Sequence, residues 1–216
     1  MSTTNHAPHR EFPSDIAFTP AVKAIQKRKG SRGSYARIEQ GEGWQTGITP
    51  DLADFLSDLD MFYLGTANAE GQPYIQYRGG PPGFLKVLDD HTMGFADFGG
   101  NRQYVTLVNL SENPKAFLFL MDYANSRRIK VWGTARVVEN DAVLEERLRD
   151  PAYSAKVERA ILFTVEARDV NCPRHIHQRF SLRQLAPVIE PLKARIAELE
   201  AEVKRLRSNP FLNNEH

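Results

Sequence analysis

The clearest strand pattern in this chain is Arg128-Ile129-Lys130-Val131-Trp132-Gly133-Thr134-Ala135-Arg136-Val137-Val138. From Ile129 onward, small or aliphatic side chains occupy every second position, and polar or bulky side chains lie between them. Because successive side chains of a β-strand point to opposite faces, this alternation predicts a strand with one face in a core. Trp132 falls on the other face, together with Arg128 and Lys130.

Shorter segments on both sides of this one are also predicted to be strands. They cover residues 61–67, 73–78, 84–88, 92–97, 116–122 and 161–168, of which 116–122 is predicted to be fully buried. Turn-forming sequences join several neighbours, which is typical of antiparallel pairing. Predicted helices cover residues 19–29, 49–59 (capped by Thr49), 102–110 and 141–148, whereas 1–18 are expected to be loosely ordered and 30–47 to form a loop. These elements predict a mainly β fold, an antiparallel β-barrel with peripheral helices.

The turn after strand 92–97, Asp97-Phe98-Gly99-Gly100-Asn101-Arg102, has the composition of an anion site. Its two glycines allow the backbone to approach a ligand closely, and Asn101 is a favoured N-cap for the helix predicted to follow. Free N–H groups at a helix start and the forked cation of Arg102 together favour a phosphate. The alternative is that Arg102 is a solvated residue of the first helical turn.

The C-terminal segment, residues 181–216, carries apolar side chains at the spacing 4-3-4-3, with charged residues between them. These residues are Leu192, Ile196, Leu199, Val203 and Leu206. The spacing predicts an amphipathic, coiled-coil-like helix. An apolar stripe this short is stable only when another surface covers it. That surface is either the chain's own barrel or the same helix of a second subunit.

The composition excludes several classes of protein. The chain has 216 residues with 28 Lys+Arg and 27 Asp+Glu, so it lacks the basic excess of a general nucleic-acid or membrane-surface binder. A single cysteine, Cys172, rules out an internal disulfide and fits a reducing compartment, so we expect a cytoplasmic protein. No spacing of Cys and His indicates a structural metal.

An ordered set of short motifs is also present. It comprises Gly83-Phe84-Leu85-Lys86-Val87-Leu88-Asp89, Thr92-Met93-Gly94-Phe95-Ala96-Asp97, Gly100-Asn101-Arg102, Glu112-Asn113-Pro114, Arg128-Ile129-Lys130-Val131-Trp132-Gly133 and Cys172-Pro173-Arg174-His175. Together these motifs resemble the pyridoxamine 5′-phosphate oxidase-like family of FMN-binding split β-barrels, in particular its predicted flavin-nucleotide-binding branch. The resemblance covers roughly residues 50–170. With the organisation of the chain it predicts a barrel domain at residues 49–180, between an N-terminal extension at 1–48 and the C-terminal helix at 181–216. It also implies a homodimer with FMN at the interface.

The family's FMN contacts carry over to matching positions, and the resemblance implies these roles here. Phe84, Leu85 and Lys86 run along the flavin, Ala96 and Asp97 end the next strand, Arg102 and Gln103 match an Arg-Lys pair that grips the phosphate, and Arg128 reaches the flavin from the second subunit. The sequence departs from the family at two positions. Gln103 replaces a lysine, which weakens the phosphate grip, and the arginine that opens the family's first FMN strand, expected near Pro81, is missing. Arg78 or Lys86 is the expected substitute. The family's pyridoxal-phosphate-binding C-terminal segment is not recognisable, so vitamin B6 oxidation is not expected.

Four further residues complete the predicted cofactor site. Asn101 belongs to the phosphate turn, Trp132 either covers the flavin ring or packs, and His175 and Arg179 either contact flavin or substrate or are simply exposed. The expected function is an FMN-dependent oxidoreductase that moves a hydride or electrons to or from a small molecule. The alternatives are a non-catalytic flavin carrier or redox sensor, and a barrel that holds a deazaflavin or a haem, the latter with His175 as axial ligand.

Overall fold

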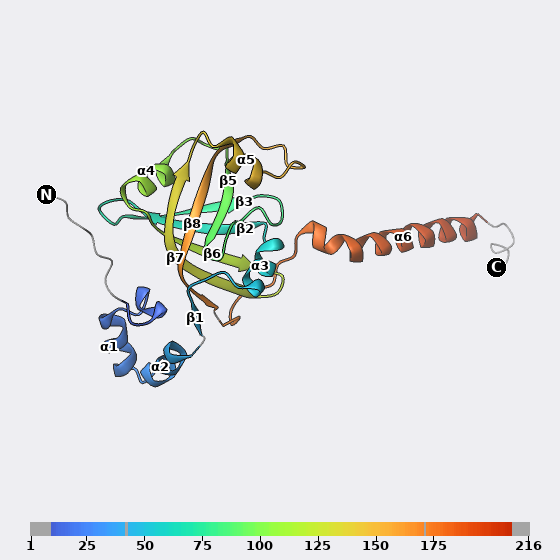
Figure 1. Cartoon of the computed structure of the whole chain (residues 1–216). Coiled ribbons are helices and arrows are strands. Elements are labelled where there is room, and N and C mark those ends of the chain that lie inside the picture. The colour runs from blue at the N-terminus through green and yellow to red at the C-terminus, as the bar shows by residue number, and fades with distance from the viewer. Residues whose placement is uncertain (1–9, 42, 171, 209–216) are drawn as a thin grey trace. The chain divides into compact units, whose positions relative to one another are not determined.

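The computed structural model describes residues 10–41, 43–170 and 172–208 (Figure 1). Its helices are η1 (Pro13–Ile16), α1 (Pro20–Arg28), α2 (Arg32–Gln40), α3 (Pro50–Ser57), α4 (Val105–Glu112), α5 (Ala142–Leu148) and α6 (Leu182–Arg207). Its strands are β1 (Trp44–Gln45), β2 (Met61–Ala67), β3 (Pro73–Gly79), β4 (Lys86–Val87), β5 (Thr92–Phe98), β6 (Lys115–Asp122), β7 (Arg127–Val138) and β8 (Val157–Val170). The chain divides into two compact units. One runs to Asp122 and resumes over Ser126–Arg174, and the other comprises Tyr123–Asn125 and the residues from His175 on.

All strands of the first unit belong to one antiparallel sheet. Their order is β3-β2-β6-β7-β8-β5-β4, and β1 adds to β8. Figure 1 shows these strands wrapped around a common interior, with α4 and α5 at one end. This arrangement confirms the predicted mainly β barrel with peripheral helices.

The interior of the barrel is filled by apolar side chains from almost every strand. Phe62 stacks on Phe84 at a centroid distance of 5.4 Å and meets the edge of Phe95 at 5.2 Å. Leu118 and Val131 are fully buried beside them, as the alternation in β7 predicted. Burial of so many large apolar groups is the main source of stability of the barrel.

The predicted loop at 30–47 is wrong, because α2 and β1 lie within it. The buried carboxylate of Glu39 holds α2 in place: it pairs with Arg32, lies 3.4 Å from Lys23 and accepts a 3.1 Å hydrogen bond from Ser14. Ser14 belongs to η1, so the expectation of loose order also fails for residues 10–18, while residues 1–9 lie outside the described residues. These long-range polar contacts override the low helix propensity of a Gly- and Ser-rich sequence.

Other predicted elements have different bounds or partners. The strand predicted at 84–88 is reduced to β4, whereas that at 161–168 extends over all of β8. β6 alternates rather than being fully buried, because its outer-face residues Phe117 and Phe119 are only half-buried. Thr49 stands at the N-cap of α3, but its hydroxyl accepts a 2.7 Å hydrogen bond from Arg168 instead of capping the helix.

In the second unit, α6 is one continuous helix of 26 residues with none of them buried. Ser181 caps it, since its hydroxyl accepts a 3.2 Å hydrogen bond from the Gln184 amide. Within the described part of the chain, no helix combines the length and apolar character that crossing a bilayer requires.

Candidate functional site

A salt bridge joins the two ends of the strand order and marks the split of the barrel. Arg78 projects from β3, the first strand of that order, and Asp97 from β5, which lies next to the last. Their side chains form an ion pair and are only 13% and 8% exposed. The guanidinium of Arg78 also lies 5.8 Å from the centroid of the Phe95 ring. The sheet therefore curls until its ends meet at a charged contact.

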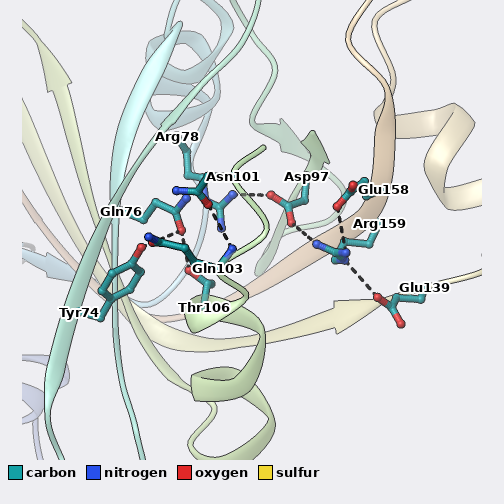
Figure 2. A network of polar contacts seen from close by, with 10 residues as sticks. All are labelled: Tyr74, Gln76, Arg78, Asp97, Asn101, Gln103, Thr106, Glu139, Glu158 and Arg159. Atoms are coloured by element: carbon teal, nitrogen blue, oxygen red, sulfur yellow. Dashed lines mark hydrogen bonds and ion pairs between the residues drawn. The ribbon is translucent and has the colours of Figure 1, made fainter. Parts of the chain in front are cut away.

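Asp97 holds a second arginine, Arg159 of β8, at 3.1 Å (Figure 2). Antiparallel pairing places Asp97 directly opposite Arg159. Arg159 also contacts Glu139 and Glu158, each at 3.1 Å. Burial alone would lower the pKa of Arg159, but hydrogen bonds to Asp97 and Glu139 outweigh it and raise that pKa. The guanidinium of Arg159 is thus held in place with its charge intact.

The turn from Gly99 to Tyr104 follows β5, but it does not begin a helix as predicted. Asn101 is not the N-cap: its Oδ1 accepts a hydrogen bond from the Gln103 amide at 3.3 Å, and α4 starts only at Val105. Arg102 and Tyr104 both adopt left-handed backbone angles, with φ of +58° and +57°. Asn side chains favour such local turns over helix, which explains the delayed helix start.

Arg78 and Asp97 both line two neighbouring pockets. The first, of about 220 Å³, is lined by the 100–104 turn, the first turn of α4, Arg78 and Arg159. The second, of about 510 Å³, is lined by five aromatic rings, those of Tyr77, Phe84, Phe95, Phe98 and Tyr153, together with small residues and polar ones that include Asp60. The two pockets share Gln76, Arg78, Asp97 and Phe98, so they form one groove with a polar end and an aromatic end.

The polar end has the chemistry of an anion site. Its lining includes three guanidinium groups (Arg78, Arg102 and Arg159) and two carboxylates (Asp97 and Glu158), a net charge of +1. The first residues of α4 also line it, and the first N–H groups of a helix have no partner within the helix. Nε of Arg78 is buried and has no hydrogen-bond partner among the described residues. Such an orphaned donor beside a pocket fits an oxyanion that supplies the missing acceptor.

Gln76 forms the remaining polar wall of the groove. Its side-chain oxygen accepts hydrogen bonds from Thr106 at 2.9 Å and from Tyr74 at 3.4 Å. Figure 2 shows these residues beside Asn101 and Gln103, on the opposite side of Arg78 from Arg159. These contacts tie α4 to β3 and fix the width of the polar end.

The residues predicted to run along the flavin have different surroundings. Phe84 and Leu85 belong to the core, and of the two only Phe84 lines the groove. Ala96 is buried and lines the aromatic end. The ammonium of Lys86 donates hydrogen bonds to the carbonyls of Arg147 and Arg149, at 3.0 and 3.1 Å, and so binds the C-terminal end of α5.

Arg128 and Trp132 lie on the outer face of β7, away from the groove lining. Trp132 packs between Trp44 and Phe117, each with a centroid distance of 5.0 Å. Nε of Arg128 is buried and, like that of Arg78, lacks a hydrogen-bond partner among the described residues.

His175 and Arg179 belong to the second unit, and both are exposed. The guanidinium of Arg179 lies 5.0 Å from the centroid of the Tyr123 ring. Cys172 is a free, exposed thiol. Over residues 10–41, 43–170 and 172–208, no three His, Cys, Asp or Glu side chains are grouped as a metal site would require.

The sequence did not indicate Arg159 or Gln76 as site residues, nor that Asp97 pairs with two arginines. Arg159 precedes the predicted strand at 161–168, so that prediction leaves it outside the sheet. The signal that identifies it is the β5–β8 register, in which Asp97 faces Arg159. Gln76 lies in the alternating strand 73–78, on the same face as Arg78, and that shared face is its only sequence signal.

The solved structures to which this chain is similar include one described as FMN-binding and one described as a heme storage protein. A variant of HupZ from Group A Streptococcus is 18% identical and has a TM-score of 0.47, covering 57% of this chain and 99% of that chain. An FMN-binding protein from Syntrophomonas wolfei is 16% identical, with a TM-score of 0.45 and coverage of 68% and 97%. HutZ, a heme storage protein from Vibrio cholerae, is 16% identical, with a TM-score of 0.37 and coverage of 55% and 89%.

Among curated proteins, none matches this chain. The family model of pyridoxamine 5′-phosphate oxidase, however, matches residues 48–176, which is more than half of the 216 residues and includes every strand from β2 to β8. The protein therefore belongs to the pyridoxamine 5′-phosphate oxidase family.

Proposed function

We propose that the groove at the split of the barrel binds flavin mononucleotide. The observation that carries this proposal is the division of one groove into a cationic end and an aromatic end, which share Arg78. Flavin mononucleotide has the matching division, with a phosphate at one end and a flat ring system at the other. The two pockets, of about 220 and 510 Å³, fall together within the usual range of about 300–1,000 Å³ for ligand pockets.

In this proposal the phosphate lies at the polar end. Arg102 and the first N–H groups of α4 bind it, with Gln103 as a neutral hydrogen-bonding partner. Arg78 contributes its orphaned Nε, which is the substitute that the missing arginine near Pro81 requires. Asp97 does not touch the ligand directly, because its two oxygens already hold Arg78 and Arg159. It acts as a positioning residue for both guanidinium groups.

The ring system occupies the aromatic end, where the exposed rings of Tyr77 and Tyr153 offer surfaces for contact and the buried Phe84 and Phe95 complete the lining. We propose that a second copy of the chain completes the site, as the family resemblance implies. Arg128 is the candidate to reach the partner's flavin, because its buried Nε lacks an acceptor within the described part of its own chain.

The function that follows is a flavin-dependent oxidoreductase acting on a small molecule. When bound, the flavin supplies the redox chemistry, since it can accept or give up a hydride or single electrons. The residues of this chain bind and orient the group, and the barrel wall excludes water from one side of it. A flavin carrier or redox sensor would use the same groove, and turnover with a reductant and an acceptor distinguishes the enzyme from it.

The test begins with the cofactor. We expect the purified protein to show flavin absorbance, or to gain it on titration with FMN, and to bind haem and deazaflavin more weakly. A Soret band on haem titration that is lost in His175→Ala, without FMN binding, would replace this proposal with a haem-binding barrel.

The polar end is tested by Arg102→Ala. Loss of a charged hydrogen bond of about 1.5–3 kcal/mol should weaken FMN binding by about 10- to 150-fold. Arg136→Ala is the matched control, because Arg136 is also an exposed arginine but does not line the groove. Equal FMN affinity in the two variants would show that Arg102 is not a phosphate ligand.

A further inference from the structure

The apolar positions of α6 follow a heptad pattern through the whole helix, further than the 192–206 seam of the sequence analysis. Position a is occupied by Leu182, Ile189, Ile196 and Val203, and position d by Leu185, Leu192, Leu199 and Leu206. A run of heptads this long, with charged residues at the flanking positions, indicates a coiled coil rather than a helix that covers a globular core.

The identity of the a and d residues selects the type of coiled coil. Three of the four a positions are β-branched, and every d position is leucine. This combination favours two parallel strands over trimers or tetramers. The two prolines within α6, Pro187 and Pro191, fall at positions f and c, on the outer side of the helix. They weaken its backbone hydrogen bonding there without interrupting the seam.

The charges beside the seam are complementary between two parallel copies. In such a pair, each g residue faces the e residue five positions later on the other helix. Arg195 (g) then faces Glu200 (e), and Glu202 (g) faces Arg207 (e). Within one helix, Arg195 also lies 2.9 Å from Glu198, and Glu202 lies 3.7 Å from Arg205. These exposed intrahelical pairs are weak and do not prevent pairing across the seam.

Six of the eight seam residues are exposed in the single chain, and the other two, Leu185 and Ile189, are half-buried. Leu182, Leu192 and Ile196 are 84%, 59% and 55% exposed, and Leu199, Val203 and Leu206 are each more than two-fifths exposed. A contiguous apolar stripe of this kind marks an interaction site. We propose that α6 forms a parallel, in-register, two-stranded coiled coil with α6 of a second copy of this chain. This contact is separate from the flavin groove and does not depend on cofactor binding.

Disulfide trapping in the full-length chain tests the proposal. In a Cys172→Ser background, Leu185→Cys and Leu206→Cys are each oxidised with copper phenanthroline and compared with Ala201→Cys, at the outer f position. In a parallel pair each d residue faces its own copy, so both d variants should form covalent dimers rapidly and the f variant should not. In an antiparallel pair, the two Leu206 positions lie about 30 Å apart, because they are separated by about 21 residues of helix.

The outcomes separate the possible occupants of the seam. Crosslinking of neither d variant would overturn the proposal, whether the helices are antiparallel or pack on their own barrels. Crosslinking of Ala201→Cys at the same rate would also overturn it, because chance collision would then explain the product. An independent test reverses charge: Glu200→Lys should slow crosslinking of Leu206→Cys, and adding Arg195→Glu should restore it. An unchanged rate in both charge variants would contradict the assigned register.

Discussion

Replacement of Asp97 by asparagine tests the salt bridge that closes the barrel. The carboxylate is 8% exposed and holds Arg78 and Arg159, each of which is 13% exposed. Breaking a buried pair by removing one partner costs about 3–5 kcal/mol, because the other charge stays buried. Arg159 keeps Glu139 and Glu158 in Asp97→Asn, so only Arg78 loses its salt-bridge partner. We therefore expect Asp97→Asn to lower the free energy of unfolding by about 3 kcal/mol, the lower end of that range.

The assay is urea unfolding followed by fluorescence and by circular dichroism, which together test two-state behaviour. The matched control is Glu139→Gln, which removes a charge from the same network at a side chain that is 51% exposed. The control should lower the free energy of unfolding by less than about 1 kcal/mol, because exposed ion pairs contribute no more than that to stability. If Asp97→Asn costs no more than the control, Asp97 does not hold the ends of the sheet together.

Three further substitutions probe other contacts. Gly133→Ala would place a Cβ 1.9 Å from the Thr164 carbonyl oxygen, so we expect a loss of about 3 kcal/mol in unfolding free energy, against almost none for Gly100→Ala, where nothing lies within 4 Å. Lys86→Ala should cost about 1–2 kcal/mol by freeing the end of α5, and a drop in FMN affinity at unchanged stability would instead make Lys86 a flavin contact. Burial alone would raise the pKa of Glu39, but hydrogen bonds from Arg32 and Ser14 outweigh burial and lower it. Its stabilisation is therefore fully present at neutral pH and shrinks as the pH falls below about 4.3 toward the lowered pKa of the folded state. Glu39→Gln should therefore lower the unfolding free energy by about 1–3 kcal/mol at pH 7 and by progressively less as the pH is lowered, whereas a loss independent of pH would contradict this.

The barrel was predictable because its strands carry their own pattern. β7 alternates so strongly that its buried face could be assigned residue by residue, and Ile129, Val131 and Ala135 are all in the core. α2 was not predictable in the same way. α2 is stabilised by Glu39, whose partners Ser14 and Lys23 lie on other elements. Contacts between distant segments of this kind cannot be predicted from the local sequence.

The candidate site was predictable only in part for a related reason. The 97–102 turn stands out by composition, and its residues do line a pocket. Arg159 approaches the turn only through the pairing of β5 with β8, which depends on the order of strands in the sheet. The delayed start of α4 depends on left-handed backbone angles at Arg102 and Tyr104, which neither residue type favours by itself.

The most direct test of the proposed function compares FMN with riboflavin, which has the same ring system without the phosphate. Isothermal titration of the purified apoprotein should show FMN binding at least about 10-fold more tightly, because only FMN engages Arg102, Arg78 and the start of α4. Equal affinity for the two flavins, or no binding of either, would contradict a phosphate site at the split of the barrel.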